Sequence, residues 1–342
     1  MATLDDPSTW PQWGIPDAQT IKMIEEEDVR VFPPVGLDSL PKLREAWSET
    51  IGNDAAEVLQ AAGSEVVSDE IHVPLRDGTT SRTLLFKPSA KPADGSALVV
   101  LIHGGGFLIG TPEMEVPACV NAVKAYGCVC LSVGYRLAPE SKYPTPYEDC
   151  WDVLQWTRSH AAELGADLSK GFVLGGTSAG GRMTGTLALW ARDSNMQPPL
   201  TGLYLNATSL AYADAIPGPY RHLYRSHVEA EAREGRRAQK SKDTFEKALD
   251  PDIHSEVWNP LGWPTDHHGL PRTYLQVCGT DYHRDEALIF ERILRLEHQI
   301  DTRVDVYPGM PHVFWFKFRN HPACKLFYKD TVAGLGWLLH LA

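Results

Sequence analysis

The chain has 342 residues, of which 43% are hydrophobic and 22% are charged, so it can bury a sizeable core and has the composition of an ordinary globular protein. Its 32 Lys and Arg against 44 Asp and Glu give a net charge of −12, which repels nucleic acid phosphates and anionic membrane surfaces. We therefore expect no nucleic acid partner and no stable membrane association.

The first residues, MATLDDPSTWPQWGIPD, are acidic and proline-rich where a signal peptide would have a basic end followed by an apolar run. No window approaches the ~18 consecutive apolar residues that a membrane helix needs. The cysteines have no CxxC spacing and mostly apolar neighbours, so we expect reduced core thiols rather than disulfides at Cys119, Cys128, Cys130, Cys150, Cys278 and Cys324. These features predict a cytoplasmic protein.

The N-terminal segment, residues 1–68, is broken by prolines and then becomes helical in pattern over residues 39–62, with apolar residues three and four apart. A predicted hairpin follows, in which residues 70–76 and 80–88 flank a turn at Asp77-Gly78. Six further strands are predicted at residues 97–103, 127–135, 171–178, 201–207, 273–281 and 302–308.

Most of these six runs are continuously apolar, as strands buried on both faces are, and helical patterns such as residues 147–164 and 284–299 separate several of them. The sequence therefore predicts an α/β fold, with a mostly parallel eight-stranded sheet and helices on both faces. The connection after the strand at residues 201–207 is too long for a plain crossover, and we interpret it as an insertion at about 208–265 that could cover a site.

A glycine-rich stretch, Gly175-Gly-Thr-Ser-Ala-Gly-Gly181, stands between a predicted buried strand and a predicted helix. It contains G-x-S-x-G, which in this context is typical of the sharp strand-to-helix turn that exposes a nucleophilic serine, here Ser178. A phosphate-binding loop would need Gly-Lys-Ser/Thr, but Arg182 and Met183 follow the glycines. A second glycine run, His103-Gly104-Gly105-Gly106, ends an earlier strand and is typical of an oxyanion hole built from main-chain N–H groups.

A serine nucleophile needs a base and an orienting acid, and in hydrolases of this kind both follow the serine in chain order. Asp281 lies just beyond a strand end, whereas Asp285 and Glu286 open a helix and suit charges at its N-terminus. His312 lies on a loop after the last strand and is the predicted base. The other downstream histidines are less well placed, in a polar loop or within or beside helices: His267, His268, His298, His321 and His340.

Six motifs together resemble the hormone-sensitive-lipase-like esterases of the α/β-hydrolase fold: HGGGF at 103–107, YRLAPE at 135–140, YPTPYEDC at 143–150, GGTSAGG at 175–181, GTDYHRDEA at 279–287 and YPGMPHVFW at 307–315. The resemblance covers about residues 70–342. It implies Ser178 as nucleophile, His312 as general base and acid and Asp281 as orienting carboxylate. It implies oxyanion donors at the N–H groups of Gly105, Gly106 and Ala179. It also implies a helical cap built from residues 1–68 and the insertion at about 208–265, over a catalytic domain at 69–342.

The chain departs from the common family form at several positions next to these motifs. The family commonly has Asp at Thr177, Asn at Arg182, Pro-Leu at Tyr282-His283 and often Gly at Val313. None of these changes removes a catalytic group, but they leave the substrate preference open.

The sequence thus predicts a serine carboxylesterase that cleaves small, moderately apolar esters through an acyl-enzyme, with no metal and no organic cofactor. The segment 1–68 contributes aromatic residues that could line a shallow pocket or belong to the core: Trp10, Trp13, Phe32 and Trp47. Two alternatives stay open: acyl transfer, amide or thioester cleavage by the same residues, or a non-catalytic receptor on the same scaffold, as in the gibberellin receptors, which lack the histidine. The sequence leaves the oligomeric state open, a homodimer included.

Overall fold

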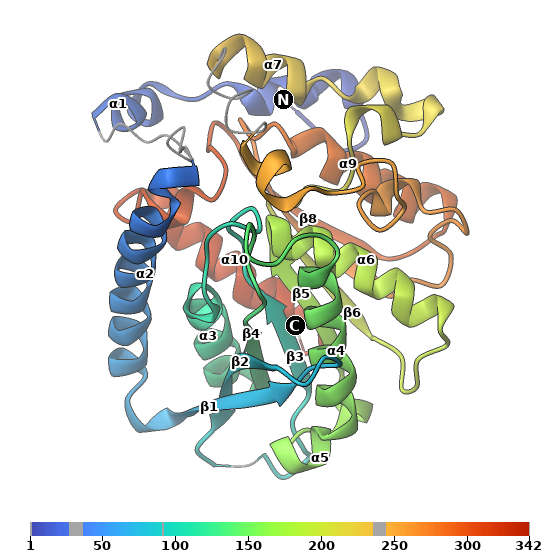
Figure 1. Cartoon of the computed structure of the whole chain (residues 1–342). Helices are drawn as coiled ribbons and strands as arrows, with labels where there is room; N and C mark the ends of the chain where they lie inside the picture. The colour runs from blue at the N-terminus through green and yellow to red at the C-terminus, as the bar shows by residue number, and fades with distance from the viewer. Residues whose placement is uncertain (1, 27–36, 91, 235–243, 342) are drawn as a thin grey trace.

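The computed structural model describes residues 2–26, 37–90, 92–234 and 244–341, and Figure 1 shows their arrangement. The eight strands form one sheet in the order β1-β2-β4-β3-β5-β6-β7-β8. Their bounds are β1 Val66–Pro74, β2 Thr80–Pro88, β3 Leu98–Ile102, β4 Val129–Val133, β5 Phe172–Thr177, β6 Gly202–Asn206, β7 Arg272–Cys278 and β8 Thr302–Tyr307. The predicted number of strands is confirmed, although β1 begins four residues before the predicted hairpin.

The strands pair as the hydrophobic pattern indicates. β1 pairs antiparallel with β2, and β2 pairs antiparallel with β4, whereas every pair from β4 to β8 is parallel. β3, β4, β5 and β6 are buried at every position, as expected for strands covered on both faces. The carboxyl ends of the parallel strands therefore lie together at one edge of the sheet.

Helices cover both faces of the sheet. The helices are α1 Ala18–Glu26, α2 Leu40–Ala62, α3 Val116–Tyr126, α4 Thr145–Ser159, α5 Ala161–Leu164, α6 Ala179–Asp193, α7 Ser226–Glu234, α9 Arg284–Arg292 and α10 Pro322–Leu338. Of these, α3, α6, α9 and α10 contact strands of the sheet directly. α3 and α10 lie on one face with α2 packed against α3, and α4, α6 and α9 lie on the other (Figure 1).

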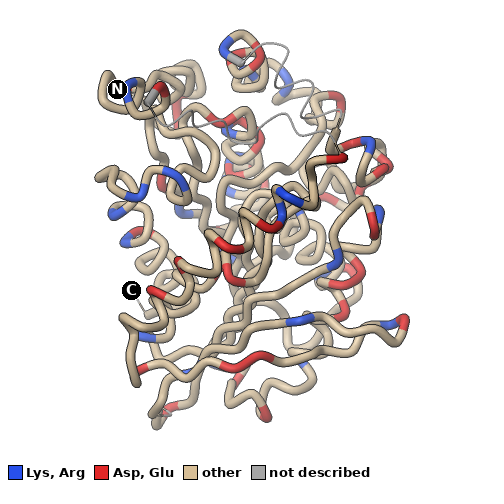
Figure 2. The backbone as a smooth tube through the Cα atoms, turned by 60° about the vertical axis from the view of Figure 1, so that its left-hand side comes forward, with Lys and Arg blue, Asp and Glu red and all other residues tan. Residues whose placement is uncertain are grey.

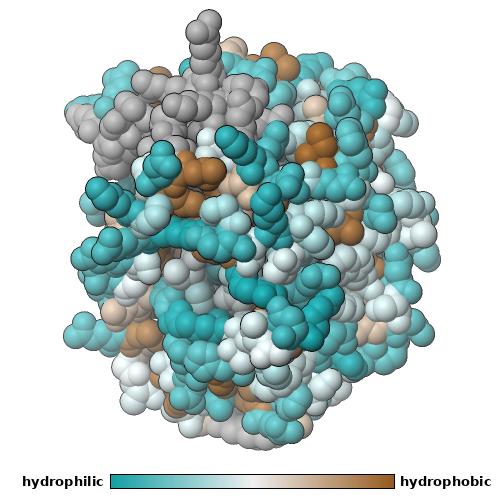
Figure 3. Space-filling view, in the orientation of Figure 1, coloured by the Kyte–Doolittle hydropathy of each residue, from teal (hydrophilic) through white to brown (hydrophobic). Residues whose placement is uncertain are grey.

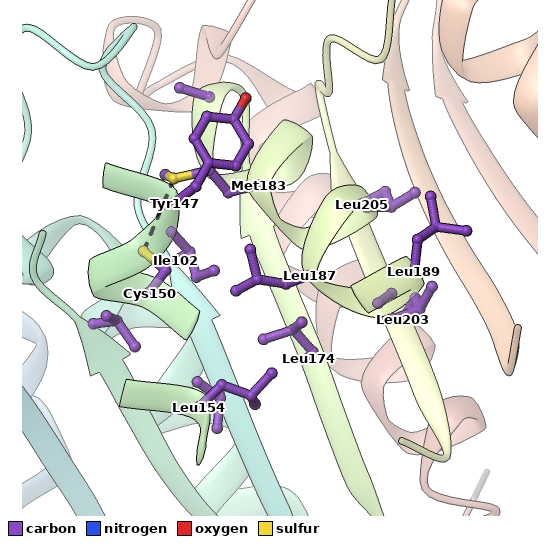
Figure 4. Close-up of a cluster of buried hydrophobic side chains, with 14 of the residues drawn as sticks. Ile102, Tyr147, Cys150, Leu154, Leu174, Met183, Leu187, Leu189, Leu203 and Leu205 are labelled. Atoms are coloured by element: carbon purple, nitrogen blue, oxygen red, sulfur yellow. Dashed lines mark hydrogen bonds between the residues drawn. The ribbon is translucent and has the colours of Figure 1, made fainter. Parts of the chain in front are cut away.

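The core between α4, α6 and the sheet is aliphatic and tightly packed (Figure 4). Leu154 of α4 and Met183 and Leu187 of α6 meet Ile102 and Leu174 of the central strands, and all five are fully buried. Burial of one such side chain stabilises the fold by about 1.5–3 kcal/mol. This packing fixes α6 against β5, and hence the turn that joins them.

The six cysteines are all buried and form no disulfide, as the sequence predicted. Charged residues of both signs are interspersed along the tube in Figure 2, without a basic face in that view. Within the described ranges no helix is long and apolar enough to cross a membrane.

Candidate active site

Ser178 lies in the turn between β5 and α6, where the backbone leaves the sheet. Its φ of 55° and ψ of −114° fall in a region that residues with a side chain rarely adopt. The turn can be this tight because glycines lie two residues before and two residues after Ser178. A Cβ on Gly180 would lie 2.0 Å from the carbonyl oxygen of Ile102. The glycines therefore allow α6 to start against β3 and leave Ser178 at the carboxyl edge of the sheet.

Three predicted residues from separate strand ends meet at this edge. Ser178 Oγ lies 2.8 Å from Nε2 of His312, and Nδ1 of His312 lies 2.5 Å from Oδ2 of Asp281. Asp281 follows β7 and His312 follows β8. The relative exposures of Ser178, Asp281 and His312 are 8%, 3% and 6%, so the chain of contacts is shielded from water.

Asp281 is ionised in this arrangement. Burial alone would raise the pKa of Asp281, but the charge and hydrogen bond of His312 and the nearby His283 outweigh it and hold that pKa below its ordinary value. The main-chain N–H of His283 also donates to Oδ1 at 3.0 Å. The carboxylate therefore accepts the Nδ1 proton of His312, which leaves Nε2 as the atom that faces Ser178.

The glycine loop after β3 lies beside Ser178, since a Cβ on Gly104 would come within 3.3 Å of the serine Cβ. Gly105 has a φ of 114°, and a Cβ there would lie 2.0 Å from the Ile109 carbonyl oxygen. The Gly105 carbonyl accepts from Leu108 and Ile109, which holds the turn. Across the described residues, the N–H groups of Gly105 and Gly106 donate to no protein acceptor.

The third predicted donor, Ala179, is the first residue of α6. The first N–H groups of a helix have no intrahelical acceptor and carry the positive end of the helix dipole. The loop and the start of α6 thus present main-chain N–H groups beside Ser178.

The side chain of His103 stabilises the glycine loop, His103-Gly104-Gly105-Gly106, of which it is the first residue. Its ring stacks on Tyr135 at 4.2 Å between centroids, and Nδ1 lies 2.7 Å from the carbonyl oxygen of Gly104. Burial lowers the pKa of His103 to about 4, so the ring is neutral near neutral pH. His103 therefore fixes the loop without adding charge to the site.

Aromatic side chains surround the glycine loop on its outer side. A Cβ on Gly106 would lie 2.2 Å from the Phe245 ring, so this ring from the insertion rests directly on the loop. Phe107 lies within 6 Å of Tyr147 and Trp258, measured between ring centroids. The sequence did not single out Phe245 or Trp258, because nothing local marks a residue of an insertion as a neighbour of the glycine loop.

Arg182, one of the departures from the family form, is buried one turn after Ser178. Its guanidinium carbon lies 4.2 Å over the Trp258 ring, and Nη1 donates to the Trp258 carbonyl oxygen at 2.5 Å. Its other terminal nitrogen, Nη2, donates to Ser209, whose hydroxyl contacts Glu286. Arg182 thus ties the helix of the predicted nucleophile to both ends of the insertion.

Asp285 and Glu286 do lie in the first turn of α9, but they do more than the predicted helix-terminal charges would. Asp285 accepts hydrogen bonds from the main-chain N–H groups of Arg225 and Ser226, at 2.8 and 2.7 Å. Glu286 accepts from those of Leu210 and Ala211, at 2.6 and 3.0 Å. Both carboxylates therefore fasten the insertion to the loop that carries Asp281.

The histidines that the sequence set aside lie elsewhere. His267 is buried and its Nε2 contacts the Pro260 carbonyl oxygen at 2.8 Å, and His321 accepts from the Ala323 N–H at the start of α10. Of the predicted aromatic residues, Trp10 belongs to the core and Trp13 and Trp47 pack against it, while Phe32 lies outside the described residues. Among the residues that the structure describes, no group of three His, Cys, Asp or Glu could hold a metal ion.

The strand order, together with Ser178, Asp281 and His312 at the ends of β5, β7 and β8, defines an α/β hydrolase. A family model described as the alpha/beta hydrolase fold matches residues 99–316. The chain is 33% identical over 308 residues to an AB hydrolase superfamily protein of Schizosaccharomyces pombe, covering 90% of each chain. It is 30% identical over 238 residues to a versiconal hemiacetal acetate esterase of Dothistroma septosporum, covering 69% of this chain and 72% of that one.

A solved structure of vibralactone cyclase superposes with a TM-score of 0.85 at 27% identity, covering 96% of both chains. The chain belongs to the hormone-sensitive-lipase-like esterases of the α/β-hydrolase fold, as its motifs predicted. It is a carboxylesterase-type, ester-cleaving hydrolase.

Proposed function

We propose that the chain hydrolyses small, moderately apolar carboxylic esters through an acyl-enzyme on Ser178, with His312 as general base and acid. The observation that carries the proposal is the continuous contact from Ser178 Oγ through His312 to the buried Asp281 carboxylate. A serine hydroxyl is a weak nucleophile without such a base, and a base of this kind needs its tautomer fixed.

The reaction would run in two halves. Ser178 Oγ attacks the ester carbonyl carbon and gives its proton to Nε2 of His312, and the N–H groups of Gly105, Gly106 and Ala179 stabilise the oxyanion. The C–O bond to the alcohol then breaks, and His312 returns the proton to the leaving oxygen. Water activated by His312 attacks the acyl-enzyme and releases the acid.

A helical cap over the site is part of the proposal. We assign it to the part of residues 1–68 that precedes α2 and to about 208–265. The catalytic domain is then the rest of 69–342 together with α2, which packs on α3, and residues 66–68, which begin β1. The segment Pro7–Gly14 packs against α7 of the insertion, and Figure 1 draws α7 and, to its left, α1 above the sheet. Phe245 rests on Gly106, which supports a short, apolar space at the predicted oxyanion hole.

The proposed substrate is a dispersed small molecule rather than a lipid surface. On the face drawn in Figure 3, hydrophilic residues cover most of the described surface and hydrophobic ones form small separate groups. A protein that sinks into a lipid surface presents a continuous apolar face instead. These features support esters with short acyl chains.

The test of the mechanism is labelling of the purified chain with a phosphonate ester probe, followed by peptide mass spectrometry, alongside kcat on p-nitrophenyl acetate. We expect the label on Ser178, and kcat for Ser178→Ala or His312→Ala about 10⁶-fold lower, since residues that act as one unit fail together. The control is Ser159→Ala at an exposed position near the end of α4. Undiminished hydrolysis by Ser178→Ala would refute the proposal.

The substrate size is tested with p-nitrophenyl esters from acetate to palmitate. Each methylene that fits should gain up to ~0.8 kcal/mol of binding, until the space under the cap ends. We expect kcat/KM to peak at short chains and fall sharply for long ones. A maximum at palmitate, or a rate that jumps when the substrate forms micelles, contradicts the proposed size limit.

Acyl transfer, amide cleavage and thioester cleavage use the same three residues and stay as alternatives. Mass spectrometry of the products separates acyl transfer from the other reactions, because hydrolysis in ¹⁸O-labelled water puts the label into the released acid, whereas transfer to an acceptor does not. The ratio of kcat/KM for a matched ester, amide and thioester of the same acid separates the three hydrolyses. A ligand receptor without catalysis is the remaining alternative, and it predicts no label on Ser178.

A further inference from the structure

A second histidine–carboxylate pair lies beside the first. Nδ1 of His283 is 2.8 Å from Oε1 of Glu286, three residues later in the chain, and both side chains are largely buried, at 11% and 1% exposure. The mechanism proposed above uses neither residue. His283 is also one of the positions at which the chain departs from the common family form.

Glu286 decides which nitrogen of His283 carries a proton. Its Oε2 accepts the N–H groups of Leu210 and Ala211, and its Oε1 accepts the hydroxyl of Tyr224 at 3.2 Å. Burial opposes ionisation of Glu286, but its His283 partner, the nearby charge of Arg182 and the N–H of Ala211 hold its pKa below the ordinary value. An ionised carboxylate can only accept hydrogen bonds, so Nδ1 of His283 must be the donor in its contact with Glu286 and carries the ring proton.

The opposite ring nitrogen of His283, Nε2, has no hydrogen-bond partner within the described ranges. In the described part of the chain Nε2 is not one of the buried side-chain atoms that lack a partner, so it is open to solvent, and a hydrogen-bonding group of a ligand can take the place of water there. Glu286 therefore orients an imidazole whose second nitrogen remains available to a ligand.

The His283 ring lies next to the predicted general base. Its centroid is 5.8 Å from that of His312, and the Tyr282 ring lies against it, tilted by 42°, at 3.8 Å between centroids. The main-chain N–H of His283 binds Asp281, which fixes the residue to the same loop. Because His312 must reach the leaving oxygen of the ester, the alcohol half of the substrate lies on the side of His312 and hence of His283.

From this geometry we propose that His283 is a specificity-determining residue that binds a hydroxyl group on the alcohol half of the substrate. The preferred substrates are then monoesters of diols or polyols, with the free hydroxyl near the ester oxygen. The inference rests on the proposed esterase function and names the substrate class of that same site.

A hydroxyl suits this position because it can donate to the neutral ring and accept from the protonated one. An alkyl group of the same size would cover Nε2 without a hydrogen bond and leave the nitrogen unpaired. Discrimination of this kind arises mainly from the polar group that the wrong substrate leaves unsatisfied.

The test compares esters that differ only by a hydroxyl in place of a methyl group. The pairs are 2-hydroxyethyl and n-propyl butanoate, and 3-hydroxypropyl and n-butyl butanoate. For each protein the measured quantity is the ratio of kcat/KM within a pair, which is independent of the fraction of active enzyme. We expect wild type to favour the hydroxyalkyl ester of at least one pair about threefold to tenfold, the value of one neutral hydrogen bond.

The main variant is His283→Asn, whose side-chain amide can still donate to Glu286 but has no atom in the place of Nε2. His283→Leu is a second variant, which restores the residue common in the family. Both should bring the ratio close to one. The matched control is His72→Asn on β1 at the far edge of the sheet, where an exposed histidine also pairs with a glutamate, Glu70, and it should keep the wild-type ratio.

A wild-type ratio of one or less for both pairs overturns the proposal, and so does a His283→Asn variant that keeps the wild-type preference. If wild type hydrolyses both members of each pair at equal kcat/KM, the proposed role of His283 is wrong, but the esterase proposal stands. If none of the four esters is cleaved and the phosphonate probe leaves Ser178 unlabelled, the esterase proposal itself fails.

Discussion

Buried carboxyl groups lie on two sides of Ser178, and their surroundings differ. On the side of the loop at residues 280–286, Asp281 and Glu286 each meet a histidine and main-chain N–H groups. Beneath the turn, Glu115 is equally buried, but Oε1 has no hydrogen-bond partner in the described part of the chain, and its neighbour is the hydroxyl of Thr177.

The pKa values move in opposite directions as a result. Burial raises the pKa of Glu115 to about 7, with only a small opposing effect from Thr177, whereas the partners of Asp281 and Glu286 outweigh burial and lower theirs. Burial alone thus does not decide the charge of a carboxyl group here. The partners of each group do, and at Asp281 they maintain the negative charge that the proposed mechanism needs.

Among these carboxyl groups, the largest expected effect comes from removing the charge at Asp281. Asp281→Asn keeps the shape of the side chain but no longer fixes the Nδ1 proton of His312, so we expect kcat on p-nitrophenyl acetate to fall on the order of 10⁴-fold. The control is Asp69→Asn on β1, an exposed aspartate of the outermost strand. A fall of less than tenfold would mean that His312 does not depend on this carboxylate.

A smaller effect is expected from Glu115→Gln, and it appears in the pH dependence of stability. Since the pKa of Glu115 is raised from 4.5 to about 7 on folding, the unfolded chain ionises first, and stability is lost between pH 4.5 and about 7. At 1.36 kcal/mol per unit this amounts to about 3 kcal/mol. The measurement is urea unfolding of wild type and variant at pH 5 and pH 8.

Glutamine does not ionise, so the variant should gain stability relative to wild type as the pH rises. The neighbouring Glu113 is the control, because its hydrogen bonds to Arg82 hold its pKa below the ordinary value against the opposing effect of burial. The contribution of Glu113 is therefore already present at pH 5, and Glu113→Gln should be less stable than wild type by nearly the same amount at pH 5 and pH 8. A Glu115→Gln variant whose stability relative to wild type is equally independent of pH would contradict the contrast between the two carboxyl groups.

The smallest expected effect is that of Glu286→Gln on stability near pH 7. The amide keeps the size but replaces an acceptor by a donor opposite N–H groups, which should cost about 1–3 kcal/mol in urea unfolding. The pKa of Glu286 is lowered from 4.5, so its contribution is present above pH 4.5 and lost as the pH falls below that value. A deficit that persists unchanged at pH 3 would show that charge is not its origin.

The sequence predicted the parts of the site that depend on local chemistry. Glycine is needed where a backbone turns sharply or approaches another backbone closely. The glycines on either side of Ser178 and after His103 therefore reveal these two turns in the sequence alone. Asp281 and His312 could be placed because the carboxyl ends of parallel strands meet at one edge of a sheet.

The sequence could not place contacts between segments that lie far apart in the chain. Asp285 and Glu286 have the pattern of a helix start, and only the folded chain brings the N–H groups of residues 210, 211, 225 and 226 to their carboxylates. Phe245 is one aromatic residue among many until it rests on Gly106. The insertion has no periodicity that would predict where it docks.

By itself, then, the sequence determined the α/β-hydrolase fold, the turn at Ser178 and the order of the residues that follow it, because hydrophobic periodicity and glycine placement act over a few residues. The tertiary structure alone decided the direction in which each buried carboxyl group shifts its pKa and the placement of the His283 ring beside that of His312. Those properties depend on which donors and rings from distant segments come within hydrogen-bonding or stacking distance, and nothing local in the chain encodes that distance.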